Sequence, residues 1–183
     1  KMEPRRRSVY LRAEGDRKTI GYYAEAYRTA VDPKERAEAL LNFCCCPYPD
    51  DPAPILMDAK SEDKNLAWAA LLAMQHIRHP KVREFALTEL GKAEQEEIIW
   101  SMLMQNSQTE DMLVWDSLLT QVLASNDRDR LHGLQWRILN AIDEGNSGLA
   151  CELPLIYETI PCSCCRRKAV RLMGERGLLT EEM

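Results

Sequence analysis

A short pattern recurs along this chain at intervals that suit stacked helical units. An Arg is followed three positions later by a small residue and four positions later by an apolar one, at Arg36/Ala39/Leu40, Arg83/Ala86/Leu87, Arg130/Gly133/Leu134 and Arg166/Ala169/Val170. The four arginines are 47, 47 and 36 residues apart, and such periods are typical of helical repeats. Because one repeat cannot bury its apolar face alone, its neighbours must stack against it. The sequence therefore predicts an all-α solenoid of stacked antiparallel helix pairs.

The composition agrees with one folded, mainly helical domain. The chain has 183 residues, with 45% hydrophobic residues but only 8 Gly and 9 Pro, so it is long enough to bury a core without covalent help. Strand-like alternation of β-branched and aromatic residues is absent from the sequence. We expect a single repeat domain over residues 19–183, preceded by a basic, partly disordered lead-in over residues 1–18.

Apolar residues at helical spacing, separated by turn residues, predict the individual helices. Breaks are expected at Asp32-Pro33, in the Pro-rich loop 47–54, at His79-Pro80, at Gly91 and at Pro161. The predicted helices cover residues 20–31, 34–46, 55–59, 64–74, 80–90, 98–104, 110–125, 128–143, 149–159 and 163–174. A further helix is expected to begin at Gly177, either as a terminal cap or as part of a truncated array.

The recurring unit resembles the HEAT-like, armadillo-type repeat family. The second helix of such a repeat opens with a turn, then Val-Arg, a small residue three positions after the Arg and a large apolar residue seven after it. The segment from His79 to Arg83, with Ala86 and Leu90, matches this pattern, and the units starting at Arg36 and Arg166 match in part. The third unit departs from it, since Arg137 stands at the large apolar position. The resemblance implies a solenoid whose groove is lined largely by second helices.

The distribution of charge disfavours nucleic acid as a partner. The net charge is −5, and residues 1–18 contain seven Lys or Arg against three acids, which leaves about −9 on the remainder. A general nucleic-acid binder needs clustered cations over its binding surface. We therefore expect a protein partner for the repeat domain.

Cysteine usage and hydropathy indicate a cytoplasmic protein. No run approaches 18 apolar residues, and no secretory signal is recognisable, so neither membrane insertion nor export is expected. The seven cysteines are an odd number, and five of them have a cysteine as a direct neighbour in the sequence. This arrangement suits reduced thiols better than a disulfide framework.

The cysteines near residue 162 are the candidates for a reactive or metal-binding site. Cys162, Cys164 and Cys165 lie at a predicted helix start, where the backbone N–H groups favour thiolate, and Cys151 is a candidate fourth ligand. The spacing is unfavourable for zinc because the sequence lacks a second Cys-x-x-Cys segment to pair with this one. Packed, reduced thiols are the simpler interpretation, so we expect no metal and no cofactor.

The other cysteines and the histidines have simpler structural interpretations. Cys44, Cys45 and Cys46 point in three directions around a helix, so burial beneath the Pro-rich loop is expected. His76, His79 and His132 are interpreted as isolated from one another and from any Ser or Asp nucleophile arrangement, with His79 as a turn residue. Phosphate-binding, paired-carboxylate and metalloprotease motifs are absent from the sequence.

An alternative function comes from the same family resemblance. Some HEAT-like proteins are DNA glycosylases that hold a damaged nucleotide with aromatic residues and an Asp on the concave face. Trp115, Asp116 and Trp136 are the residues of these types here. A Trp at helical spacing among Leu and Val more often belongs to a core.

We therefore expect a non-catalytic scaffold or adaptor that binds another macromolecule, a protein before a nucleic acid. The expected contacts are polar residues of the second helices, namely Lys81, Glu84, Arg128 and Lys168. The alternatives are a HEAT-like DNA-modifying enzyme and a protein with a cysteine metal or redox site.

Overall fold

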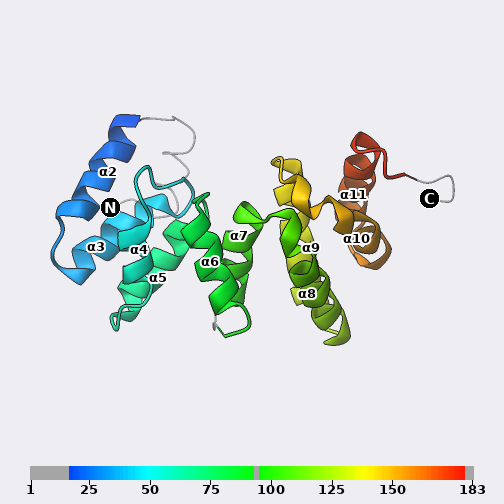
Figure 1. Cartoon of the computed structure of the whole chain (residues 1–183), viewed down its shortest axis with the longest axis horizontal. Coiled ribbons are helices and arrows are strands. Elements are labelled where there is room, and N and C mark those ends of the chain that lie inside the picture. The colour runs from blue at the N-terminus through cyan, green and yellow to red at the C-terminus, as the bar shows by residue number, and fades with distance from the viewer. Residues whose placement is uncertain (1–16, 93–94, 180–183) are drawn as a thin grey trace. The chain divides into compact units, whose positions relative to one another are not determined.

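The computed structural model describes residues 17–92 and 95–179, and Figure 1 shows that the elements in this part of the chain are helical. The predicted all-α class is therefore confirmed for the described residues, which contain no strand. The helices are α2 (Arg17–Thr29), α3 (Pro33–Leu40), η1 (Leu41–Phe43), α4 (Ala53–Asp58), α5 (Lys64–Met74), α6 (Pro80–Glu89), α7 (Glu96–Asn106), η2 (Thr109–Asp111), α8 (Met112–Ala124), α9 (Arg128–Asp143), η3 (Ser147–Glu152), α10 (Leu153–Thr159) and α11 (Ser163–Glu175).

The described residues form two compact units, the first ending at Asn106 and the second beginning at Ser107. In the first unit, α2 packs on α3, α3 packs on α5, and α6 packs on α7. The repeat pattern predicts that residues 80–90 form the second helix of a repeat. In the structure this helix, α6, instead begins the hairpin that α7 completes (Figure 1).

Local capping signals explain where the helices of the first unit begin and end. The carboxylate of Asp32 accepts hydrogen bonds from the backbone N–H groups of residues 34 and 35, and Pro33 occupies the first turn of α3. His79 caps α6 by accepting a hydrogen bond at Nδ1 from the Lys81 N–H. Gly91 has a φ of +76°, a left-handed conformation that glycine adopts without strain. The predicted stop after α6 is confirmed.

A polar network joins three helices of the first unit. The Arg36 guanidinium on α3 donates to the Asp58 carboxylate on α4 at 2.6 Å, and the Tyr27 hydroxyl on α2 donates to the same oxygen at 2.6 Å. Arg36 also lies over the Tyr27 ring, 4.6 Å from its centroid. Burial is the main cause that raises the pKa of Tyr27 far above its ordinary value, and the hydrogen bond to Asp58 is the second. The Tyr27 hydroxyl therefore keeps its proton and remains a hydrogen-bond donor.

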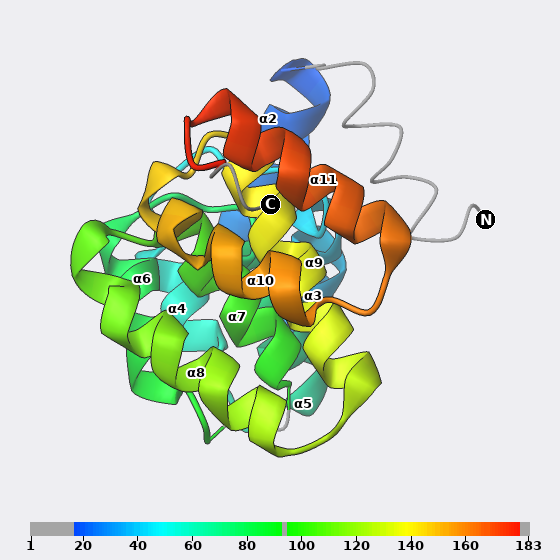
Figure 2. The same ribbon diagram turned by 90° about the vertical axis from the view of Figure 1, so that its right-hand side faces the viewer.

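In the second unit, α8 and α11 each pack against α9, and α10 forms a hairpin with α11. Figure 2 shows α10 and α11 side by side. Large apolar side chains are fully buried here, among them Trp115, Leu134, Ile138, Ile156 and Leu172. The predicted helix 128–143 agrees with α9 at both ends. Asp127 caps its start, and Gly145, with a φ of +100°, follows its end.

Four predicted helix boundaries are wrong. The first helix, α2, begins at Arg17 and not at residue 20, so it includes the last two residues of the expected lead-in. The helix expected to run to Cys46 ends at Leu40, and 3-10 and turn geometry follow. Residues 147–152 are also a 3-10 helix, so α10 starts only at Leu153. Residues 177–179 are not helical, and Gly177 has a φ of +66°. The rest of that predicted helix, residues 180–183, and the lead-in up to residue 16 lie outside the described residues.

Asp143, at the end of α9, connects that helix to α11 through two cations. Its carboxylate lies 2.8 Å from the Lys168 ammonium and 2.7 Å from the Arg171 guanidinium. Hydrogen bonding by Lys168, and then by Arg171, lowers the pKa of Asp143 to about 2. A carboxylate with a depressed pKa stabilises the fold above its unfolded pKa of about 3.9, and this stabilisation is lost as the pH falls.

We expect the stability of the second unit to decrease between about pH 4 and pH 2, and Asp143→Asn to remove this part of the acid dependence. The effect should be at most about 1 kcal/mol, because solvent screens a carboxylate with 36% of its side chain exposed. Urea unfolding at pH 2, 4 and 6 measures it. If the stability of the variant depends on pH in the same way, the two ion pairs of Asp143 do not contribute to the acid dependence of the second unit.

No helix among the described residues is both long and apolar enough to cross a membrane.

Candidate functional site

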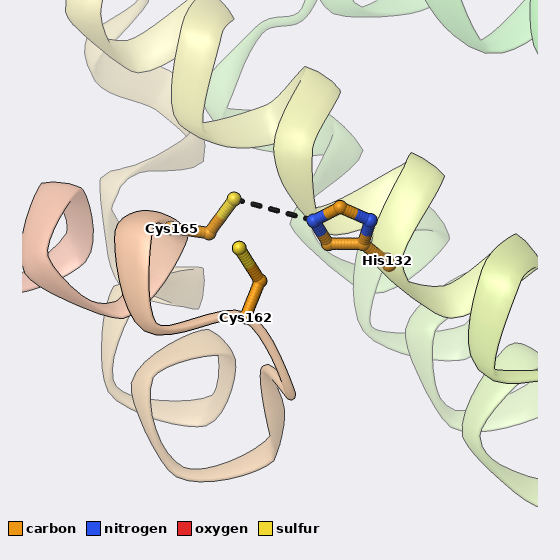
Figure 3. Close-up of side chains that lie close together, drawn as sticks. All are labelled: His132, Cys162 and Cys165. Carbon is orange, nitrogen blue, oxygen red and sulfur yellow. Dashed lines mark hydrogen bonds between the residues drawn. The ribbon is translucent and has the colours of Figure 1, made fainter.

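Two thiols and one imidazole meet in the second unit. The ligand atoms of His132, Cys162 and Cys165 all lie within 4.8 Å of one another. The His132 Nε2 is 3.3 Å from the Cys165 Sγ. Figure 3 shows the two sulfur atoms close to each other and both facing the same edge of the imidazole ring. His132 and Cys162 are half-buried, whereas Cys165 is buried. We call these three residues the thiol-imidazole cluster.

Helix geometry explains how two of the three residues come together. Cys162 is the residue before α11, in extended conformation, and Cys165 follows three positions later within the first turn. Residues three apart at a helix start lie on the same side of the helix. The packing of α11 on α9 then places His132, from the second turn of α9, opposite this pair.

Two further contacts hold the segment that leads into Cys162. The Arg166 guanidinium donates to the carbonyl oxygen of Ile160 at 2.9 Å, which fixes the end of α10 against the start of α11. The Gln135 side chain, fully buried on α9, donates to the Thr159 hydroxyl at 2.6 Å. The backbone that carries Cys162 is therefore tied to both α9 and α11.

The two thiols have opposite electrostatic environments. A hydrogen bond from the backbone N–H of Cys165, and secondly one from the Cys165 thiol, lower the pKa of Cys162 to about 7. Burial, followed by Cys162, raises the pKa of Cys165 to about 11. One thiol is thus readily ionised near neutral pH, and its neighbour holds its proton.

A cleft of about 610 Å³ lies in the same unit. It is lined by Val122, Leu123, Asn126, Asp127, Arg128, Leu131, Thr159 and Pro161. Leu131 and Pro161 directly precede His132 and Cys162 in the sequence, but none of the three cluster residues lines the cleft.

The structure changes the set of candidate cysteines. Cys162 and Cys165 are brought together, but Cys151 and Cys164 are exposed and are not part of the cluster. The Cys151 thiol lies instead 3.7 Å from a Glu152 carboxylate oxygen, and burial, then Glu152, raise its pKa. His132, expected to be isolated from the other histidines and from any Ser or Asp nucleophile arrangement, lies beside these two thiols. The Cys-x-x-Cys spacing was visible in the sequence, but no sequence signal pairs it with a histidine thirty residues earlier.

The cysteines of the first unit do not form a comparable site. Cys46 is buried, as expected, and Cys44 and Cys45 are half-buried. Burial, followed by Cys44, raises the pKa of Cys46 to about 11. His76 lies beside this segment, with its Nε2 3.0 Å from the Cys44 carbonyl oxygen. These contacts fit a structural role.

The residues suggested for nucleotide binding are not equally accessible. Trp115 is fully buried, and its indole N–H donates to the Ser107 hydroxyl at 2.9 Å. Asp116 is exposed, and Trp136 is 49% exposed. Trp115 is therefore unavailable for stacking on a base.

The four predicted contact residues also differ in their surroundings. Glu84 and Arg128 are exposed, and Arg128 lines the cleft. Lys81 is half-exposed and lies 3.5 Å from Asp51. Lys168 donates to Asn140 and pairs with Asp143, which holds its ammonium against α9.

In reduced, metal-free protein, we expect alkylation by iodoacetamide to modify Cys162 before Cys165. Its rate should rise through about pH 7, because the thiolate is the nucleophile and the pKa of Cys162 is lowered to that value. Mass spectrometry of timed digests measures this order. Cys165→Ala should shift the profile of Cys162 to higher pH. A Cys162 profile centred near the ordinary cysteine pKa of about 8.5 in the unsubstituted chain would contradict the expectation.

Comparison of the chain with protein-family models, curated proteins and solved structures finds no match.

Proposed function

We propose that this chain is a HEAT-like helical-repeat scaffold, without catalytic activity of its own, that binds a protein partner in a reducing, cytoplasmic compartment. The observation that carries the proposal is an open groove between α2 and α3, with the rings of Tyr22 and Tyr23 on one side and carboxylates on the other. The seven cysteines, all within the described residues, form no disulfide, which is consistent with that compartment.

The recurring Arg supports the repeat interpretation. In the first unit, Arg36 reaches the carbonyl oxygen of Ala30, and in the second unit Arg166 reaches that of Ile160. Both carbonyls lie six residues before the Arg, just after the end of the preceding helix. The small residues that follow, Ala39 and Ala169, are both buried. A shared role in two units is what a repeated structural element requires.

The aromatic side of the groove has the composition of a protein-binding surface. Tyr22 is 69% exposed, and its ring meets that of Tyr23 edge to face, with centroids 5.3 Å apart. The groove has a volume of about 370 Å³, and Ala26, Ala30 and Ala39 also line it. Tyrosine is enriched at protein interfaces because its ring offers a large contact area and its hydroxyl a polar end.

The opposite side of the groove indicates the kind of segment that would bind. Glu35 and Glu38 line it and are both exposed. Carboxylates beside aromatic rings favour a partner segment that presents Lys or Arg next to apolar side chains. The exposed residues Glu84 and Arg128 remain secondary contact candidates, and Lys81 and Lys168 are weaker ones because each already has an acidic partner.

Site-specific photocrosslinking with the full chain tests the proposal. With p-benzoylphenylalanine in place of Tyr22, we expect discrete protein adducts in cell extract that do not form when the same probe replaces Glu62, an exposed residue outside the groove. Glu35→Lys combined with Glu38→Lys should remove these adducts while circular dichroism stays unchanged. Identical adducts from both probes, or adducts that persist after charge reversal, would refute a partner site in this groove.

A further inference from the structure

We propose that the thiol-imidazole cluster of the second unit is a binding site for one Zn²⁺ ion, with His132, Cys162 and Cys165 as its three protein ligands. This inference is independent of the groove and of the protein partner, because it rests on the convergence of three ligand atoms from α9 and α11. Imidazole nitrogen and thiolate sulfur are the ligands that Zn²⁺ prefers in proteins.

The distances between the ligand atoms fit a tetrahedral ion. With Zn–S bonds of about 2.3 Å and a Zn–N bond of about 2.0–2.1 Å, neighbouring ligands lie about 3.8 Å apart for two sulfurs and about 3.6 Å apart for sulfur and nitrogen. The observed separation between the His132 Nε2 and the Cys165 Sγ is 3.3 Å, and no separation within the cluster exceeds 4.8 Å. Figure 3 shows the three side chains converging from α9 and from the start of α11.

The ligand set is specific among the cysteines nearby. Cys164 adjoins Cys165, but consecutive residues point about 100° apart around a helix, and Cys164 is exposed outside the cluster. Cys151 lies in η3 beside Glu152. Within the described residues, no fourth His, Cys, Asp or Glu completes the group.

Three protein ligands leave one tetrahedral position for water or for an exogenous ligand, as in zinc sites that are not purely structural. Binding releases the two thiol protons to solvent, and the Nε2 lone pair of neutral His132 completes the protein ligands. The resulting Zn²⁺-dithiolate centre has no net charge, which suits a half-buried position.

The surrounding contacts hold the ligands in place before the metal arrives. Arg166 fixes the Ile160 carbonyl just before Pro161 and Cys162, and Gln135 ties the end of α10 to α9. The ion would then connect α9 to the start of α11, so it should stabilise the second unit by binding only its folded form.

Titration of the full chain with Co²⁺ under a non-thiol reductant tests the site. We expect one Co²⁺ per chain, with a thiolate-to-cobalt charge-transfer band and the visible bands of a tetrahedral centre, both abolished by one equivalent of Zn²⁺. Cys162→Ser, Cys165→Ser and His132→Ala should each weaken binding at least about 100-fold, because loss of an outer-shell partner alone costs 10–100-fold.

Cys164→Ser and Cys151→Ser are the matched controls and should bind Co²⁺ as the unsubstituted chain does. Because a cluster variant could fail to fold, circular dichroism is recorded for each, and thermal unfolding with and without Zn²⁺ provides a second readout. We expect Zn²⁺ to raise the unfolding temperature of the unsubstituted chain and of both controls, but not of the cluster variants.

Reduced, folded protein without the cobalt bands would overturn the proposal. So would a control variant that loses binding, or a Cys162–Cys165 pair that forms a disulfide readily but takes up no metal when reduced.

Discussion

Trp115→Ala is expected to lower the free energy of unfolding of the second unit by about 3–5 kcal/mol, the usual cost of removing a buried aromatic side chain. The ring is fully buried, and its indole N–H is bonded to Ser107. The substitution therefore creates a cavity and leaves the Ser107 hydroxyl without this partner. Hydrogen exchange of amides in α8, α9 and α11 is the appropriate measurement, because it reports the stability of individual helices.

Trp136→Ala is the matched control for this prediction. Its ring is 49% exposed, so the same chemical change should cost about 1 kcal/mol or less. Equal losses for the two variants would contradict the placement of Trp115 in the core. The comparison also bears on the DNA-modifying alternative, since an aromatic residue that stacks on a nucleotide must be accessible and should contribute little to stability.

Asp58→Ala should destabilise the first unit by about 3 kcal/mol, because removing one member of a largely buried ion pair leaves the other charge without compensation. The Arg36 and Asp58 side chains are only 23% and 13% exposed, and Asp58 also accepts a hydrogen bond from the Tyr27 hydroxyl. One substitution therefore disrupts the contact between α2, α3 and α4. Urea unfolding, monitored by exchange of amides in α3 and α5, reports the loss.

Glu25→Ala provides a control at the same interatomic distance. Arg28 and Glu25 also lie 2.6 Å apart, but their side chains are 51% and 61% exposed. An exposed pair of this kind contributes about 0–1 kcal/mol. If Asp58→Ala and Glu25→Ala lower the free energy of unfolding equally, burial does not explain the contribution of the Arg36–Asp58 pair to stability. A double-mutant cycle with Arg36→Met separates the pair from the Tyr27 hydrogen bond.

Helix starts and stops were the most predictable features of this chain. Asp32-Pro33, His79-Pro80, Gly91 and Asp127 each act on backbone groups within a few residues, so their effects are encoded locally. The boundaries that failed have weaker local signals. At Cys44–Cys46 and at residues 149–152 the apolar spacing continues, but the structure has turn or 3-10 geometry.

The pairing of helices was less predictable than the helices themselves. The pattern around Arg83 resembles the second helix of a repeat, but α6 opens a hairpin with α7. Asn106, at the end of α7, accepts from the His79 N–H and donates to the Ile77 carbonyl oxygen, which holds the α5–α6 turn against α7. No local pattern around residue 80 encodes a contact with residue 106.

The sequence by itself determined that this chain is helical and where most helices begin, because capping and periodicity depend on neighbours within one or two turns. It also showed the Cys162-x-x-Cys165 spacing that places two thiols on one side of a helix start. Only the tertiary structure decided that His132 faces those thiols while Cys151 and Cys164 do not. The reason is that a ligand cluster between two helices depends on the packing of α9 against α11, which buries apolar surface from both.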